Sequence, residues 1–164
     1  MKKVVFISGL VLAFTISFKG FAAEHGGQEH GGKAMHEHPA QKVKNFSAKE
    51  IKKAIQNHAK EVADKNGIFS LKDDKTEELL DLKFVKVHDP VRKLKNNRYF
   101  ACTDFQVSGA LEKLYDIDFW LEPKDGKLTV TQTKVHKHPE LQKDTWEKHA
   151  RYTFKGEEIV PIDN

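Results

Sequence analysis

The stretch that decides the fold is an alternating run in the second half of the chain, Leu114-Tyr115-Asp116-Ile117-Asp118-Phe119-Trp120-Leu121. Its bulky apolar side chains recur at every second position: Tyr115, Ile117, Phe119 and Leu121. Because a β-strand sends successive side chains to opposite faces, this spacing predicts a strand with one face in the core. The other face carries Asp116, Asp118 and Trp120, and we expect it to be mostly exposed to solvent, with Trp120 packed under residues 137–148.

Strand-like segments flank this run on both sides. Residues 99–107 precede it, and residues 128–136 follow it after the turn-forming residues 122–127. Other apolar runs predict outer strands at 68–71, 79–87, 151–154 and 158–160. Residues 140–148, which follow Pro139, are predicted as a short helix. The core of the sheet is therefore expected to be an antiparallel meander of three strands around residues 114–121.

A long helix is expected ahead of the strands. Ser47 and Glu50 have the spacing of a capping box, and Phe46 and Ile51 have that of a hydrophobic staple. Apolar side chains then recur at helical spacing on one face: Ile51, Ile55, His58, Ala59 and Val62. The pair Asn66-Gly67 is typical of a helix end, so the helix is predicted from Ala48 to about Lys65.

These elements predict an α+β domain in which one N-terminal helix packs on a curved antiparallel meander of four to five strands. The order of elements over residues 46–136 resembles the cystatin-like architecture, in which a curved meander cradles a helix. We take from this resemblance an expectation about the fold only. The predicted organisation is a signal peptide at 1–22, a disordered His- and Gly-rich tail at 23–45 and a single domain at 46–164.

The amino-terminal segment has the pattern of a secretory signal. Lys2 and Lys3 precede an apolar run, residues 4–18, and small residues stand at Gly20 and Ala22. The apolar run is shorter than the roughly 20 residues of a membrane span, so we expect cleavage and release to the periplasm or the medium, with no membrane attachment. Three of the 28 Lys and Arg residues and none of the 24 Asp and Glu residues lie in this segment, so cleavage lowers the net charge from +4 to +1. Such a chain has no electrostatic reason to bind nucleic acid.

The tail at 23–45 is rich in glycine and histidine and has almost no apolar content, so we expect it to be disordered. Four of the nine histidines of the chain fall here, with one methionine among them: His25, His30, Met35, His36 and His38. Imidazole is a ligand for Cu, Ni and Zn ions, and histidine-rich tracts are typical of metal binding. Cleavage after Ala22 would also leave a free amine with His25 third, which resembles the amino-terminal Cu(II)- and Ni(II)-binding motif. The alternative is a solvated tail with incidental histidines.

Several residues of the predicted domain can also carry chemistry. If the strands pair in register, Asp104, Asp116 and Asp118 share one sheet face, where they bind a hard cation, provide a base with a raised pKa or form an ordinary solvent face. Cys102 is the only cysteine, so it forms no internal disulfide, and it is either a buried inert thiol or a nucleophile or metal ligand.

Four further histidines are open to two interpretations. His136 and His138 stand two apart and either chelate a metal or lie on the surface. His58 is expected as a core histidine bonded to a backbone carbonyl rather than a ligand, and His88 beside Asp89 as a weak orienting pair.

The sequence favours a small exported, non-enzymatic protein whose histidine-rich tail binds metal for buffering or delivery. One alternative is a small-ligand-binding or enzymatic cup between helix and sheet that uses Asp116, Asp118 and His58. Another is an interaction module that binds an unknown protein partner through a sheet edge or Trp120. No phosphate loop, nucleophile elbow, paired-cysteine motif or HExxH is present, and we assign no catalytic residue.

Overall fold

The structure is a computed structural model that describes residues 44–162. One helix, α1 (Ala48–Val62), leads into the strands. Ser47 and Glu50 form the predicted capping box, and the buried face of α1 carries Ile51, Ile55 and Ala59. The helix ends three residues before the predicted Lys65.

The end of α1 differs from the prediction because its cap is an extended residue, Ala63, rather than the Asn66-Gly67 pair. The Asp64 carboxylate accepts hydrogen bonds from the amides of Asn66 and Ile68, and Gly67 has φ +74°. The left-handed glycine therefore shapes a separate turn between α1 and the first strand.

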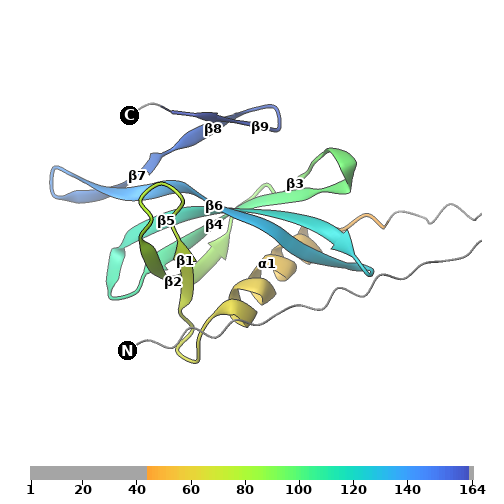
Figure 1. Ribbon diagram of the computed structural model, residues 1–164, viewed down its shortest axis with the longest axis horizontal. Coiled ribbons are helices and arrows are strands. Elements are labelled where there is room, and N and C mark those ends of the chain that lie inside the picture. The colour runs from red at the N-terminus through yellow and green to blue at the C-terminus, as the bar shows by residue number, and fades with distance from the viewer. Residues whose placement is uncertain (1–43, 163–164) are drawn as a thin grey trace, which may run out of the picture. The chain divides into compact units, whose positions relative to one another are not determined.

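The strands form a large antiparallel sheet and a separate hairpin (Figure 1). The sheet holds β1 (Phe69–Lys72), β2 (Leu79–Val87), β3 (Arg92–Lys93), β4 (Tyr99–Val107), β5 (Ala110–Lys124), β6 (Lys127–Gln142) and β7 (Thr145–Ala150). Its order is β1-β2-β4-β5-β6-β7, with β3 also paired to β4, and a 3-10 turn (Lys95–Asn97) joins β3 to β4. β8 (Tyr152–Lys155) and β9 (Glu158–Pro161), which match the strands predicted at 151–154 and 158–160, pair with each other as a hairpin. The α+β class is confirmed, but the sheet has seven strands instead of four to five.

The two strands that were not expected are β3 and β7, and β7 begins within residues 140–148, where the predicted helix is wrong. Lys143 and Asp144 both have positive φ angles, 45° and 69°, which is the geometry of a two-residue hairpin turn. β6 therefore continues to Gln142 and pairs with β7. Pro139 is tolerated in β6 because it lies beyond the last β5–β6 pair, Asp116 with Lys137, so only one neighbouring strand is left to bond.

The alternation of residues 115–121 is confirmed on the face that α1 covers. Ile117, Phe119 and Leu121 are fully buried there, together with Phe105 of β4. The rings of Phe119 and Phe105 stack with centroids 6.0 Å apart, and Phe69 of β1 lies 6.4 Å from Phe119. This is the main hydrophobic core.

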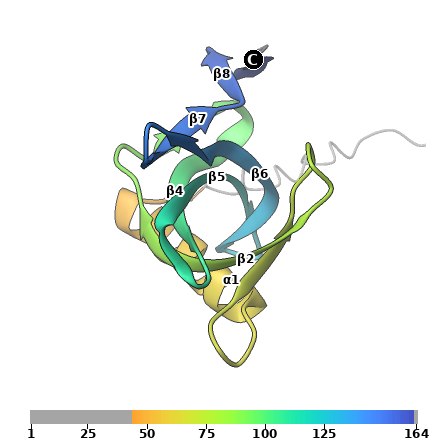
Figure 2. The same ribbon diagram turned by 90° about the vertical axis from the view of Figure 1, so that its left-hand side faces the viewer.

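The opposite face of the sheet is also buried, so the expectation of a solvent face is wrong. Asp116 and Asp118 are 1% and 0% exposed, and Trp120 is 6% exposed. Trp120 packs on Phe100 of β4 and on Phe154 of β8, with centroids 5.2 and 6.4 Å away. Figures 1 and 2 show why: α1 lies on one side of the strongly curved sheet and the β8–β9 hairpin lies on the other. The cover over Trp120 comes from this hairpin rather than from residues 137–148.

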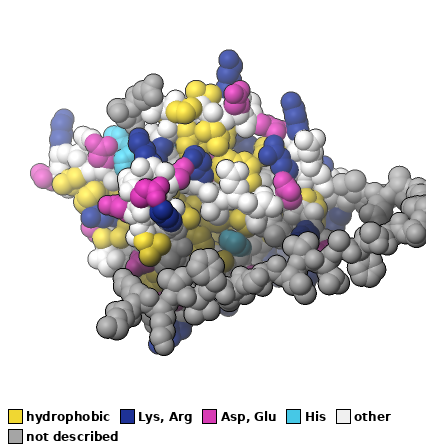
Figure 3. Space-filling model, viewed as in Figure 1, with side chains coloured by type: hydrophobic (Ala, Val, Ile, Leu, Met, Phe, Trp, Pro, Cys, Tyr) yellow, Lys and Arg dark blue, Asp and Glu magenta, His cyan; other side chains and the backbone are white. Residues whose placement is uncertain are grey.

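Charged side chains of both signs are interspersed over the molecular face shown in Figure 3. Within residues 44–162, no helix has the length and apolar content needed to cross a membrane. The unusual feature of the domain is its second sheet face, which buries carboxylates.

Candidate metal centre

Three neighbouring strands bring a thiol, a carboxylate and an imidazole together on the second face. Cys102 of β4 lies directly opposite Asp118 of β5 in the strand register. His136 of β6 is the extra residue of an irregularity, because Ile117 pairs with Val135 while Asp116 pairs with Lys137. Such a bulge re-aims a side chain. Here the His136 ring lies beside both Cys102 and Asp118.

The three potential ligand atoms lie within 4.8 Å of one another. The Cys102 Sγ is 3.9 Å from His136 Nδ1, and the same nitrogen is 3.4 Å from Asp118 Oδ2. Two ligands at a tetrahedral angle around a zinc ion stand about 3.3–3.6 Å apart, given the usual Zn–S, Zn–N and Zn–O bond lengths. The cluster is thus close to the spacing that an ion of this size requires.

Asp118 is the most constrained member of the cluster. Its Oδ2 accepts a 2.7 Å hydrogen bond from the hydroxyl of Tyr152, a residue of β8. Its Oδ1 is buried and has no hydrogen-bond partner among residues 44–162. Leaving a buried polar atom unpaired costs about 1–3 kcal/mol, and more for a charged group. A buried carboxylate with a vacant oxygen is a feature that a bound cation would explain.

The cluster is not arranged as a nucleophile with its base. Burial raises the pKa of the Cys102 thiol, and the nearby Asp118 charge raises it further, so the thiol is protonated at neutral pH. In a catalytic triad the nucleophile and the acid bind the two different ring nitrogens of histidine. Here Cys102 and Asp118 both approach Nδ1 of His136. This arrangement suits three ligands around one central ion.

Tyr152 contacts two of the three potential ligands, His136 and Asp118. Its ring stacks on His136 with centroids 4.7 Å apart and an interplanar angle of 20°. Burial, with the Asp118 charge, raises the pKa of Tyr152, so its hydroxyl stays a hydrogen-bond donor. Groups that orient metal ligands in this way commonly tune both geometry and affinity. No sequence pattern marks Tyr152, because its contacts with His136 and Asp118 depend on how the β8–β9 hairpin folds back.

A second polar cluster lies beside the first and is already neutralised. Lys148 of β7 donates hydrogen bonds to Asp104 at 2.8 Å and to Asp116 at 2.5 Å. His88 lies 2.8 Å from Asp104, and Lys137 lies 3.3 Å from Asp116. Burial opposes ionisation of Asp104, but its hydrogen bonds with Lys148 and His88 outweigh burial and lower its pKa to about 2.

The predicted common face of the three aspartates is therefore real, but it is not a solvent face. His88, Cys102 and Asp116 also offer atoms within 4.8 Å of one another. His88 and Asp116 are occupied, however, by the partners just described. In the set of Cys102, Asp118 and His136, the Asp118 carboxylate keeps its other oxygen, Oδ1, buried and without a hydrogen-bond partner among residues 44–162.

The other predicted histidine sites are rearranged. His138 lies beside His149, with ring centroids 6.3 Å apart, whereas His136 contacts Tyr152 and Asp118. His88 contacts Asp104 instead of Asp89, which pairs with Lys52.

His58 packs edge-on against Phe69 and Phe119 on the helix side of the sheet. It therefore lies on the opposite side from Asp116 and Asp118, and the predicted cup formed by these three residues is not assembled. It also makes no bond to a backbone carbonyl within the described part of the chain. The tail residues His25, His30, Met35, His36 and His38 lie outside the described residues, so their metal binding stays a prediction.

Comparison with known proteins adds no relative. No protein-family model, curated protein or solved structure matches the chain. The chemistry of the site is therefore the basis on which a function can be argued.

Proposed function

We propose that the domain binds a transition-metal ion through Cys102, Asp118 and His136, and that the protein is an exported, non-enzymatic metal carrier or buffer. The observation that supports this most directly is the convergence of three different ligand atoms within 4.8 Å, one of them on Asp118, whose buried Oδ1 has no hydrogen-bond partner within residues 44–162. The three ligands come from three adjacent strands, so the sheet holds them in place before an ion arrives.

The mixture of ligand atoms favours particular ions. A thiolate with an imidazole suits Zn²⁺ and copper, whereas Mg²⁺ and Ca²⁺ prefer sites built from oxygen alone. A bound cation would reverse the environment that keeps the Cys102 thiol protonated, because a coordinating thiol loses its proton to the metal. Three protein ligands leave a fourth position open, through which an ion could be received or passed on.

The histidine-rich tail fits the same function as a first point of capture. Its histidines are close in sequence but must be ordered by the ion itself, which weakens binding. The ligands of the domain are preorganised, so we expect the domain to hold an ion more tightly than the tail. Capture by the tail and retention by the domain would together serve buffering or delivery outside the cytoplasm.

Titration with Co²⁺ tests this proposal, because a cobalt–thiolate bond gives a charge-transfer absorption in the near ultraviolet. The exported form, residues 23–164, is compared with a tail variant in which the four tail histidines are replaced by alanine. We expect the band in both proteins at one ion per chain, and its loss in Cys102→Ser. Absence of the band in the unaltered chain, or its persistence in Cys102→Ser, would refute the site.

A matched pair of histidine variants controls for general effects of substitution. His136→Ala should abolish the cobalt–thiolate band, whereas His149→Ala should retain it, because His149 lies beside Glu140 and outside the cluster. Equal effects of the two substitutions would show that His136 is not a ligand.

A further inference from the structure

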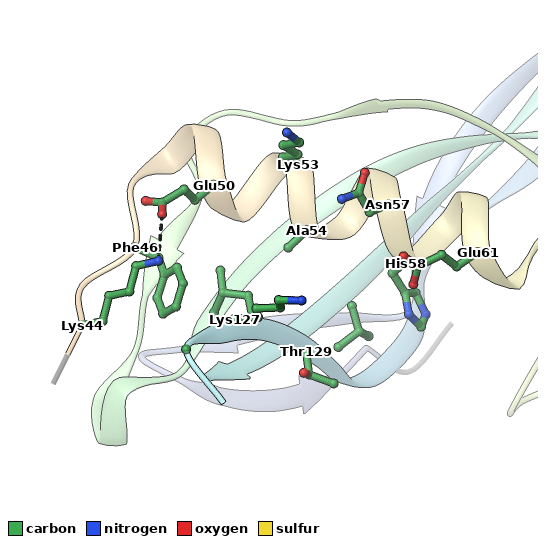
Figure 4. A pocket seen from close by; sticks show the side chains of 13 residues that line it. Lys44, Phe46, Glu50, Lys53, Ala54, Asn57, His58, Glu61, Lys127 and Thr129 are labelled. Atoms are coloured by element: carbon green, nitrogen blue, oxygen red, sulfur yellow. Dashed lines mark ion pairs between the residues drawn. The ribbon is translucent and has the colours of Figure 1, made fainter. Parts of the chain in front are cut away.

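A groove lies between α1 and the first half of β6, on the helix side of the sheet (Figure 4). It has a volume of about 580 Å³, which is within the range of small-molecule sites. None of its lining residues belongs to the Cys102 cluster. The groove is therefore a separate feature of the domain.

The floor of the groove is apolar. Phe46, Ala54, Leu128 and Val130 line it, and all four pack against the main core while remaining partly exposed. Apolar surface in a concave position gains free energy when a ligand covers it, at about 25 cal/mol for each Å² removed from water. The floor thus favours a ligand with a hydrocarbon or aromatic part.

The rim of the groove has an excess of unpaired positive charge. Of its two acids, Glu50 is already bound by Ser47 and by Lys44, whose Nζ is 3.3 Å away. Lys53 and Lys127 have no ion-pair partner within residues 44–162, and only Glu61 remains to offset them. In Figure 4 the Lys127 side chain extends into the space between α1 and β6. This rim favours an anionic group and disfavours a cation.

His58 adds a polar group that no described residue uses. It lines the groove, and within residues 44–162 its ring nitrogens make no hydrogen bond, although the ring packs on Phe69 and Phe119. Burial lowers the pKa of His58, so the imidazole is neutral at pH 7 and offers one N–H donor to a ligand. Figure 4 shows it on the same side of α1 as Lys127.

We propose that this groove binds a small amphipathic monocarboxylate, with the apolar part over Phe46, Leu128 and Val130 and the carboxylate at Lys127 and His58. One ammonium and one neutral donor match a single carboxylate. This inference does not depend on the metal site.

Calorimetric titration of residues 23–164 with decanoate tests the proposal, with decanol and decyltrimethylammonium as comparators of the same chain length. We expect saturable binding of decanoate at one per chain, at least ten-fold tighter than that of either comparator. Lys127→Gln should weaken decanoate binding five- to ten-fold. Lys124→Gln is the matched control, because Lys124 lies opposite Lys127 in the β5–β6 ladder but does not line the groove.

The proposal is overturned if decanoate does not saturate, if the three probes bind equally, or if the two lysine variants behave alike. Cys102→Ser should bind decanoate as the unaltered chain does. If the unaltered chain binds decanoate but not cobalt, only the metal site is refuted. If it binds cobalt but not decanoate, only the carboxylate site is refuted.

Discussion

Replacement of Asp118 by asparagine tests whether the buried Asp118 carboxylate serves metal binding or the stability of the fold. Asp118 is 0% exposed, its Oδ2 is bonded to Tyr152, and its Oδ1 has no hydrogen-bond partner within residues 44–162. An amide has nearly the same shape and can still accept the Tyr152 hydrogen bond, but it removes a buried charge. The amide is also unpaired at this place, but an unpaired neutral group costs about 1–3 kcal/mol and an unpaired charge costs more. We therefore expect metal-free Asp118→Asn to be more stable than the unaltered chain by about 1–2 kcal/mol, which raises Tm by roughly 3–6 °C.

Urea unfolding in EDTA and in excess Zn²⁺ measures the free energy of unfolding of both proteins without and with the metal. Zinc at 100 times its dissociation constant should stabilise the unaltered chain by about 2.7 kcal/mol and Asp118→Asn hardly at all. The order of stability should thus reverse when the metal is added. The reasoning is refuted if Asp118→Asn is less stable than the unaltered chain in EDTA by more than about 1 kcal/mol. Asp104→Asn is the control: its carboxylate is paired with Lys148 and His88, so it should destabilise the domain in both conditions.

Three further predictions follow from the fold. Phe119→Ala should lower the free energy of unfolding by about 3–5 kcal/mol in urea, because Phe119 is fully buried between α1 and the sheet; a loss below about 1 kcal/mol would contradict this packing. Burial raises the pKa of Asp73, but hydrogen bonds from Arg151 and the Lys75 amide outweigh it and lower the pKa from 3.8 to about 2. The stability that the ionised Asp73 contributes is complete above about pH 4 and is lost as the pH falls towards 2. Asp73→Asn should therefore flatten the acid side of the profile of unfolding free energy against pH. An unchanged profile would show that the Asp73–Arg151 pair does not cause the loss of stability in acid. Removal of residues 23–44 should change the free energy of unfolding by less than about 0.5 kcal/mol, because the cap of α1 starts after them; a larger fall in the urea midpoint would show that the tail docks.

The helix and the main core could be predicted from sequence because their signals are local. The capping box of Ser47 and Glu50 depends on residues three apart, and the start of α1 agrees with it. The alternation at Ile117, Phe119 and Leu121 likewise needs only the strand period of two. In both cases the residues that carry the signal lie within the element that they predict or directly beside it.

The second face could not be predicted, because its burial depends on distant residues. Asp116 and Asp118 read as solvent-facing from their charge, yet Lys148 and Tyr152, some 30 residues later, supply their partners. Those partners are in place only because residues 140–148 continue the sheet. The turn at Lys143 and Asp144 has positive φ at two residues that rarely adopt it, so no glycine or asparagine marked it in the sequence.

The candidate site shows the same limit at the level of single residues. The sequence predicts that His136, if it chelates a metal, does so with His138, because regular alternation places them on one side. The bulge opposite Asp116 and Ile117 instead turns His136 towards Cys102 and Asp118. A one-residue irregularity in the ladder thus decides the ligand set, and nothing in the order of the residues specifies it.

The second face contains two kinds of buried carboxylate, and the contrast between them is informative. Asp104 and Asp116 share the Lys148 ammonium, so the fold itself neutralises them. Asp118 is more deeply buried than Asp104, yet it faces a protonated thiol and an imidazole, and within residues 44–162 one of its oxygens has no hydrogen-bond partner. A domain that needed only to fill this face could place an apolar side chain of similar volume at position 118 at little cost in stability. A cation that arrives after folding would give Asp118 the partner that Lys148 gives to Asp104 and Asp116, and this difference is what places the proposed ion at Asp118.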